Sequence, residues 1–151
     1  MKTNKDQDNC LLLVDDDADD QYMIKQAFTM LKFDTKIQTA NDGVELFDYL
    51  HKKGKFENIS APVPKVILLD LNMPVKDGRE CLKEIKATPS IRKIPVVVYS
   101  TSSNPDDVAY SYELGASGYL VKPYSFNELV EAMDVFKKYW FSLIKTSGIN
   151  L

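Results

Sequence analysis

The sequence predicts an α/β fold in which a doubly wound parallel sheet of five strands carries helices on both faces. Short, uninterrupted apolar runs are typical of strands that are buried on both sides, as strands are in a parallel sheet. Along the chain these runs alternate with segments whose apolar residues recur at helical spacing, which favours right-handed strand–helix–strand units. The expected strands span residues 10–14, 35–40, 66–70, 95–99 and 118–121.

Length and composition indicate one ordinary globular domain. The chain has 151 residues, of which 44% are hydrophobic and 27% charged. Its net charge of -3 argues against a nucleic-acid-binding protein, which usually carries a basic surface. The chain shows no signal peptide and no apolar run near the roughly 20 residues of a membrane helix, and Cys10 and Cys81 have the spacing of separate reduced thiols. We therefore expect a cytoplasmic protein with a disordered tail at 1–9, one domain at 10–146 and a second tail at 147–151.

The predicted helices begin at capping residues and carry one apolar face each. Acidic residues at the start of the first helix suit its free N–H groups and its dipole. Its apolar face is expected to be Ile24, Ala27, Phe28 and Leu31. The turn at 41–43 starts the second helix, whose inner face would be Val44, Phe47 and Leu50. Later helices start at 77–78, 104–105 and 125, and the last carries a long apolar stripe: Phe126, Leu129, Val130, Met133, Phe136, Trp140, Leu143 and Ile144.

Two segments leave alternatives open. Residues 52–64 form a polar loop of about 13 residues, longer than most connections, so it is either a tolerated surface insertion or a recognition loop. The aromatic segment 139–141 is either part of the core or part of an interface.

Polar side chains follow four of the five expected strands. Asp15 and Asp16 follow the first strand, Asp70 ends the third, Ser100 follows the fourth and Lys122 follows the last. In a doubly wound sheet these strand ends open on the same edge, where ligands bind. Clustered carboxylates repel one another unless a cation intervenes, and oxygen ligands with water access suit Mg²⁺. A carboxylate, a hydroxyl and a lysine around such an ion form a receptor for a phosphoryl group, and the carboxylate can be its nucleophile.

Five separated motifs occur in one order along the chain: Val14-Asp15-Asp16, then Asp70-Leu71-Asn72-Met73-Pro74, then Asp77-Gly78, then Ser100, then the stretch from Gly115 to Pro123. With these motifs the chain resembles the receiver domains of two-component response regulators, the CheY-like family, over about residues 10–135. The resemblance implies a flavodoxin-like sheet with the strand order 2-1-3-4-5. It also implies a phosphoacceptor with self-catalysed phosphotransfer and slow autodephosphorylation, not an enzyme with a separate substrate.

The resemblance assigns a metal site and a phosphoryl site. Asp70 would be the phosphoacceptor. Asp16 and Asp70 would bind Mg²⁺ directly, with Asp15 acting through water and Asn72 giving its backbone carbonyl.

The resemblance also names the residues of the switch. Ser100 and Lys122 would hold the phosphoryl group, and Tyr119 would be the switching aromatic. The family often has Thr in place of Ser100; the hydroxyl is kept, and only the packing of a methyl group differs.

The implied partners are a sensor histidine kinase or a phosphotransfer protein, and an unknown downstream protein. Because nearly the whole chain resembles a receiver, we expect no output domain, no nucleic acid and no membrane. The loop at 52–64, the stretch 77–80 and the aromatic segment 139–141 are similar to the small regulators paired with bacterial phytochromes, so the kinase could be phytochrome-like. The apolar stripe of the last helix suggests a homodimer.

Three alternatives compete with this interpretation. A haloacid dehalogenase-type phosphatase also uses a carboxylate after an apolar strand, but it needs a second Asp two positions later, and that position is Asn72. An interaction module that is never phosphorylated would not need the acidic residues and Lys122. The acidic run after the first strand could, taken alone, be only a helix start, and the single histidine, His51, suits a surface role better than catalysis.

Overall fold

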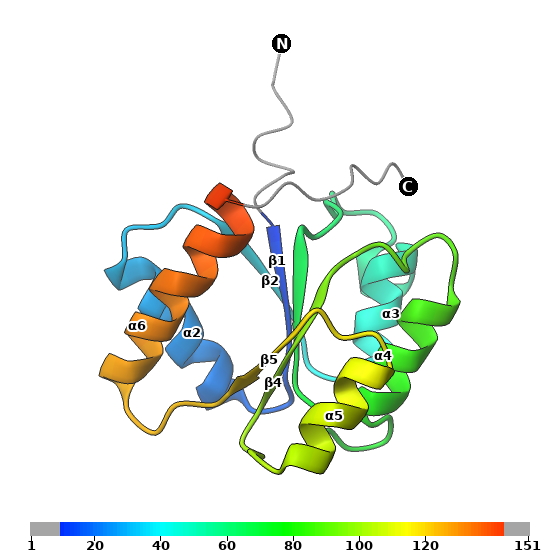
Figure 1. Cartoon of the computed structure of the whole chain (residues 1–151). Helices are drawn as coiled ribbons and strands as arrows, with labels where there is room; N and C mark the ends of the chain where they lie inside the picture. The colour runs from blue at the N-terminus through cyan, green and yellow to red at the C-terminus, as the bar shows by residue number, and fades with distance from the viewer. Residues whose placement is uncertain (1–9, 144–151) are drawn as a thin grey trace.

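Five parallel strands form one sheet in the computed structural model, which describes residues 10–143 (Figure 1). The strands lie side by side in the order β2-β1-β3-β4-β5, which confirms the predicted doubly wound fold. The two predicted tails, and residues 144–146 of the predicted domain, lie outside the described residues. The strands are β1 (Cys10–Val14), β2 (Lys36–Ala40), β3 (Val66–Leu69), β4 (Val96–Ser100) and β5 (Gly118–Val121).

Helices cover both faces of this sheet. Figure 1 shows α2 and α6 on one face and α3, α4 and α5 on the other. Each of the five helices has the expected cap, since the side chain before it accepts a backbone N–H of the first turn. The helices are α2 (Ala18–Met30), α3 (Gly43–His51), α4 (Gly78–Ala87), α5 (Pro105–Glu113) and α6 (Phe126–Lys138), with the short turns η1 (Gly54–Phe56) and η2 (Tyr139–Leu143).

The central strands divide their side chains between two cores. Leu11 and Leu13 of β1 pack under α2 and α6, whereas Leu12 and Val14 pack under α3 and α4. Every residue of β1 and β3 is buried, as a continuous apolar run predicts. Full burial of such side chains stabilises the fold by roughly 1.5–3 kcal/mol each, so these two strands hold the residues that follow them firmly in place.

The predicted inner face of α3 is wrong in part. Leu50 is buried as expected, but Val44 is 56% exposed and the buried positions are Leu46 and Tyr49. Tyr49 can lie inside because its hydroxyl donates to a carbonyl of the loop that follows, at 2.7 Å. Phe47 is only partly buried, and the Nζ atom of a neighbouring lysine lies 4.3 Å from the centre of its ring.

The predicted apolar stripe of the last helix is mostly internal. Phe136 and Trp140 are buried, so Trp140 belongs to the core and not to an interface. The ring of Phe141 lies 5.5 Å from that of Phe33, which ties the η2 turn to the segment after α2. Leu143, in contrast, is 75% exposed, because η2 is a π-helical turn and changes the phase of the stripe. Ile144 lies outside the described residues.

None of the helices within residues 10–143 is both long enough and apolar enough to cross a membrane.

Candidate functional site

Three carboxylates gather at the carboxyl ends of β1 and β3. Asp15 is fully buried, Asp70 is 5% exposed and Asp16 is open to solvent. One oxygen from each lies within 4.8 Å of the others, so the three side chains can bind one cation together. The predicted cluster is therefore present in the structure.

The backbone around Asp70 is fixed from two sides. The amide of Asp70 donates to Val14 at 2.9 Å, which continues the pairing between β3 and β1. On the other side the first residue of α4, Gly78, lies against the peptide unit of Asp70. A Cβ atom added to Gly78 would stand 2.2 Å from the carbonyl oxygen of Asp70 and 2.7 Å from Cα of Leu71. Only glycine allows α4 to begin so close to the site.

Lys122 spans the cluster from the end of β5. Its Nζ lies 3.0 Å from Oδ2 of Asp15, 2.7 Å from Oδ2 of Asp20 and 3.7 Å from Oδ1 of Asp70. Burial lowers the pKa of Lys122, but the hydrogen bonds to Asp20 and Asp15 outweigh this effect, so the net shift of the pKa is upward. The contacts with these carboxylates therefore favour the charged ammonium form of Lys122.

Asp20 is a residue that sequence reasoning did not place in the site. The sequence indicated it only as an acidic residue at a helix start, which it also is. Its position in the sequence could have indicated this role. Asp20 lies in the first turn of the helix that directly follows Asp15 and Asp16, so its carboxylate lies at the same edge of the sheet. Lys122 consequently has a partner outside the predicted metal ligands.

The two buried carboxyl groups are shifted toward their neutral forms. Burial raises the pKa of Asp70 to about 7; Lys122 acts in the opposite direction, while the charges of Asp15 and Asp16 raise the pKa further. Burial also raises the pKa of Asp15, although its Oδ1 accepts the backbone N–H of Asp17 at 2.9 Å. Crowded carboxylates that resist ionisation indicate a site built to receive additional positive charge.

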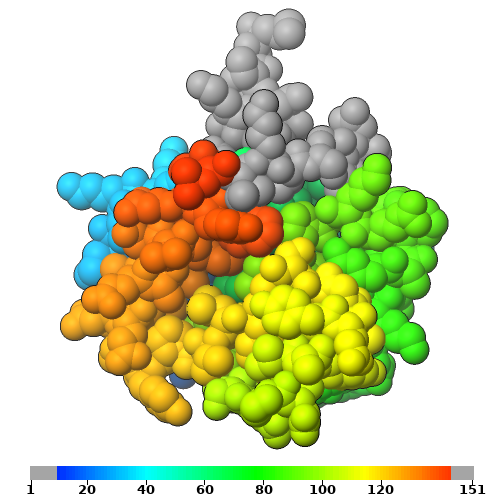
Figure 2. All heavy atoms as spheres, viewed as in Figure 1, coloured from blue at the N-terminus to red at the C-terminus, as the bar shows by residue number. Residues whose placement is uncertain are grey.

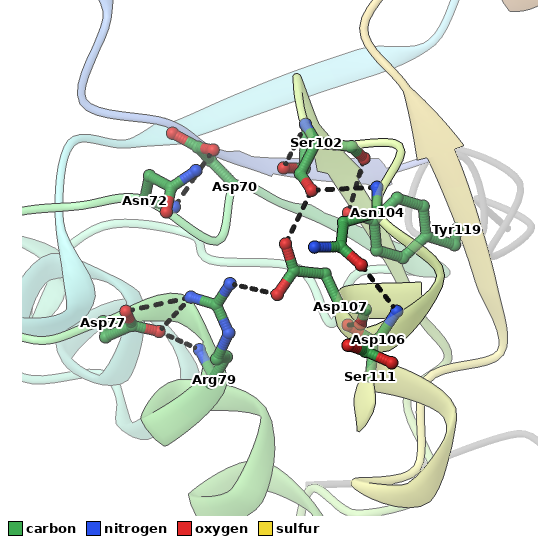
Figure 3. Close-up of polar contacts among 11 residues, drawn as sticks. Asp70, Asn72, Asp77, Arg79, Ser102, Asn104, Asp106, Asp107, Ser111 and Tyr119 are labelled. Atoms are coloured by element: carbon green, nitrogen blue, oxygen red, sulfur yellow. Dashed lines mark hydrogen bonds and ion pairs between the residues drawn. The ribbon is translucent and has the colours of Figure 1, made fainter. Parts of the chain in front are cut away.

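Of the remaining predicted residues, Asn72 contacts Asp70, whereas Ser100 and Tyr119 bond to the loop that follows β4. The amide of Asn72 donates to Oδ1 of Asp70 at 3.3 Å. Ser100 is fully buried, and its hydroxyl oxygen accepts the N–H of Ser102 at 3.1 Å. Tyr119 is half-buried against the core, and its hydroxyl donates to the carbonyl of Ser102 at 2.8 Å (Figure 3). The tyrosine is thus already tied to the loop between β4 and α5.

A charged pair beside the site was also not predicted. Arg79, in the first turn of α4, contacts Asp77 at 3.1 Å and Asp107 of α5 at 3.2 Å. Sequence spacing could not reveal the second contact, because Arg79 and Asp107 stand 28 residues apart on different helices.

The fold and the site together are those of a phosphoacceptor module, and comparison with known proteins agrees. The family model described as the response regulator receiver domain matches residues 11–134, and the chain belongs to this family of two-component response regulators. Receiver domains are signalling proteins, and the haloacid dehalogenase alternative is not favoured.

Similar proteins extend along nearly the whole chain. The sequence is 38% identical over 134 residues to response regulator Rcp1 of Synechocystis sp., covering 89% of this chain and 90% of Rcp1. The crystal structure of the phosphorylated cyanobacterial phytochrome response regulator RcpA is similar, with a TM-score of 0.83 and 37% identity over 93% of this chain and 99% of RcpA. The Mn²⁺-bound form of Rcp1 has a TM-score of 0.82 and 36% identity, over 93% of this chain and 99% of that one. Together with the carboxylate cluster, that form indicates divalent-metal binding at such a site.

Proposed function

We propose that Asp70 accepts a phosphoryl group from a phosphohistidine of a sensor histidine kinase or a phosphotransfer protein. The observation that carries this proposal is the burial of Asp70 between two other carboxylates and Lys122, at the open end of a central strand. One oxygen of Asp70 forms the new O–P bond while the P–N bond of the donor histidine breaks, and the imidazole leaves. The protein would then lose the phosphoryl group slowly to water.

The residues around Asp70 suit the charges of this step. Lys122 carries a positive charge within 3.7 Å of Asp70 and can neutralise part of an anionic phosphoryl group. Ser100 lies buried at the end of β4, where its hydroxyl can donate to a phosphoryl oxygen once it turns from its own loop. The phosphoryl group would in this way favour one arrangement of the β4–α5 loop and Tyr119, and so determine the surface read by a downstream protein.

The same cluster suits Mg²⁺. Its donors are oxygen atoms, and the exposed Asp16 leaves room for the waters that Mg²⁺ keeps. Asp16 and Asp70 would bind the ion directly, with Asp15 acting through water and the backbone carbonyl of Asn72 as a further ligand. When bound, the ion supplies positive charge against which an anionic donor can approach.

The donor is proposed to be a phytochrome-like histidine kinase, acting in the cytoplasm. Support comes from the resemblance of residues 77–80 to the small regulators paired with bacterial phytochromes. The similarity of the chain to a cyanobacterial phytochrome response regulator supports it as well. The acidic net charge of -3 disfavours a nucleic-acid partner. Self-association is proposed as well, through exposed residues of α6 and η2: Val135, Tyr139 and Leu143.

The test is phosphorylation followed by intact mass. Wild type, Asp70→Asn and the control Asp106→Asn are incubated with a small phosphodonor, with Mg²⁺ or with EDTA. Wild type and the control should gain one phosphoryl group with Mg²⁺ only, and Asp70→Asn should gain none. Equal labelling of Asp70→Asn, or labelling that survives EDTA, would contradict the assignment. A phosphotransfer profile against the histidine kinases of the source organism then identifies the donor.

A further inference from the structure

A chain of polar contacts joins the start of α4 to the loop between β4 and α5. We call Arg79, Asp107 and Ser102 the relay. Nη2 of Arg79 lies 3.2 Å from Oδ1 of Asp107, and the hydroxyl of Ser102 donates to Oδ2 of Asp107 at 2.6 Å. Figure 3 shows Asp107 between the other two, with both carboxylate oxygens in use. Arg79 is in turn anchored to Asp77, the residue that caps α4.

Ser102 is the point at which the relay meets the switch. Its N–H donates to the hydroxyl oxygen of Ser100 at 3.1 Å, and its carbonyl accepts the hydroxyl of Tyr119 at 2.8 Å. Its own hydroxyl oxygen also accepts the N–H of Asn104 at 3.2 Å. All three polar groups of one loop residue are therefore engaged, and the side-chain group is fixed by the relay.

The ion pair of the relay is partly buried and joins two helices, unlike an ordinary surface ion pair. The side chains of Arg79 and Asp107 are 25% and 32% exposed, and the pair bridges two helices that no other described ion pair connects. Hydrogen bonds from Ser102 and then from Arg79 lower the pKa of Asp107 and so favour its ionised form. An exposed ion pair alone contributes little to stability. The main structural effect of the Arg79–Asp107 pair is therefore to hold Ser102 in position.

We propose that Arg79 and Asp107 are positioning residues that act through Ser102. They hold the β4–α5 loop in the arrangement that binds the hydroxyl of Tyr119, and so favour the tyrosine-engaged state before any phosphoryl group is present. Two helix starts, one beside the phosphoacceptor and one beside the switch loop, are thereby fastened together. The part of the inference that concerns phosphorylation rests on the proposed function; the part that concerns Tyr119 does not.

Coupling between the switch loop and the site around Asp70 is reciprocal. If a phosphoryl group favours the engaged state, anything that already favours that state strengthens phosphoryl binding by the same factor. Loss of the relay should therefore weaken the binding of a phosphoryl analogue without touching Asp70 or Lys122. A change of about fivefold corresponds to the lower end of ordinary coupling between sites.

The experiment compares Asp107→Asn with Asp106→Asn. Both variants remove one negative charge from the first turn of α5, but the carboxylate of Asp106 has no hydrogen bond or ion pair with residues 10–143. The protein is labelled with 3-fluorotyrosine, and the ¹⁹F signal of Tyr119 is identified by its loss in Tyr119→Phe. Without phosphate, Asp107→Asn should shift this signal toward that of a solvent-exposed tyrosine, while Asp106→Asn should leave it unchanged. Arg79→Gln should resemble Asp107→Asn.

The second measurement is a titration with beryllium fluoride and Mg²⁺ as a phosphoryl analogue. Asp107→Asn should bind it about fivefold more weakly than wild type and Asp106→Asn. A Tyr119 signal that is identical in wild type, Asp107→Asn and Arg79→Gln, with all three proteins folded by circular dichroism, overturns the proposal and leaves the relay a stabilising contact only. If the analogue binds no variant, the proposed function fails, yet the ¹⁹F comparison still decides the relay.

Discussion

At the scale of single residues, the burial of Asp70 has a consequence for stability. Its pKa of about 7 in the folded protein lies above the usual value of 3.8. Between these two pH values the folded protein keeps a proton that the unfolded chain has released, so stability falls as pH rises through this range. The neutral isostere in Asp70→Asn removes that loss.

We therefore expect Asp70→Asn to be more stable than wild type in EDTA at pH 8, by on the order of 1 kcal/mol. The difference should shrink at pH 5, where the folded wild type is largely protonated at Asp70. Thermal melts at both pH values measure it, and Mg²⁺ should raise the melting temperature of wild type more than that of the variant. A variant that melts below wild type at pH 8 would show that the cluster carries no strain. Asp16→Asn should give a smaller gain, because Asp16 is exposed.

A second residue-scale prediction concerns Asp20. Asp20→Asn removes the shortest contact of Lys122, at 2.7 Å, and should destabilise the protein by about 1 kcal/mol, below the usual range for charged hydrogen bonds because Asp20 is partly exposed. Asp19→Asn, in the same turn of α2, is the matched control and should be close to neutral. Urea unfolding decides between them. Phosphorylation of Asp70 should persist in Asp20→Asn, since Asp15 still holds Lys122.

At the scale of elements, the start of α4 is where packing is tightest around the site. Gly78→Ala places a methyl group against the backbone of Asp70 and should destabilise the protein by about 3 kcal/mol. Gly118→Ala is the control, because its new Cβ would lie 3.6 Å from the side chain of Val97, an ordinary contact. Urea unfolding should separate the two variants, and equal stabilities would mean that α4 can move away from Asp70 without cost.

Most strands and helix starts could be predicted from the sequence, whereas contacts between separate elements could not. Uninterrupted apolar runs, and alternation in the case of β2, located the strands to within a residue or so, and the capping residues located the starts of the five α-helices within 10–143. Periodicity failed in part for α3: it placed Val44 on the inner face, whereas Leu46 and Tyr49 are buried there, the latter with a hydrogen-bond partner for its hydroxyl. The contacts of Asp20 with Lys122 and of Arg79 with Asp107 join residues far apart in the sequence, so they depend on how separate elements pack together.

At the scale of the whole molecule, the proposed dimer must use a narrower surface than the sequence suggested. Figure 2 shows α6 and η2 (orange to red) at the surface beside α5 (yellow). Truncation after Lys138 would remove Trp140 from the core and would report on folding instead of association. Val135 and Leu143, 68% and 75% exposed, are the better targets.

We expect the double variant Val135→Lys with Leu143→Lys to lower the sedimentation mass of the phosphorylated protein while leaving its fold intact. Lysine at two exposed positions keeps the core and adds like charges across a symmetric contact. Val44→Lys, at an exposed position on α3 away from this surface, is the control. A wild type that stays monomeric at high concentration, with or without phosphate, would remove the idea of a dimer.

The packing of α6 on α2 also bears on how the chain is made. Ile24 and Phe28 share one core with Met133 and Trp140, which follow more than 100 residues later in the sequence. Figure 1 shows α2 and α6 side by side on the same face of the sheet. During synthesis α2 leaves the ribosome long before the residues that cover it. Its apolar face therefore stays exposed while the residues between them are translated. The nascent chain has its acidic residues in place early, but it cannot close this core until residue 140 has emerged. Signalling competence should consequently appear only after residue 140 has left the ribosome.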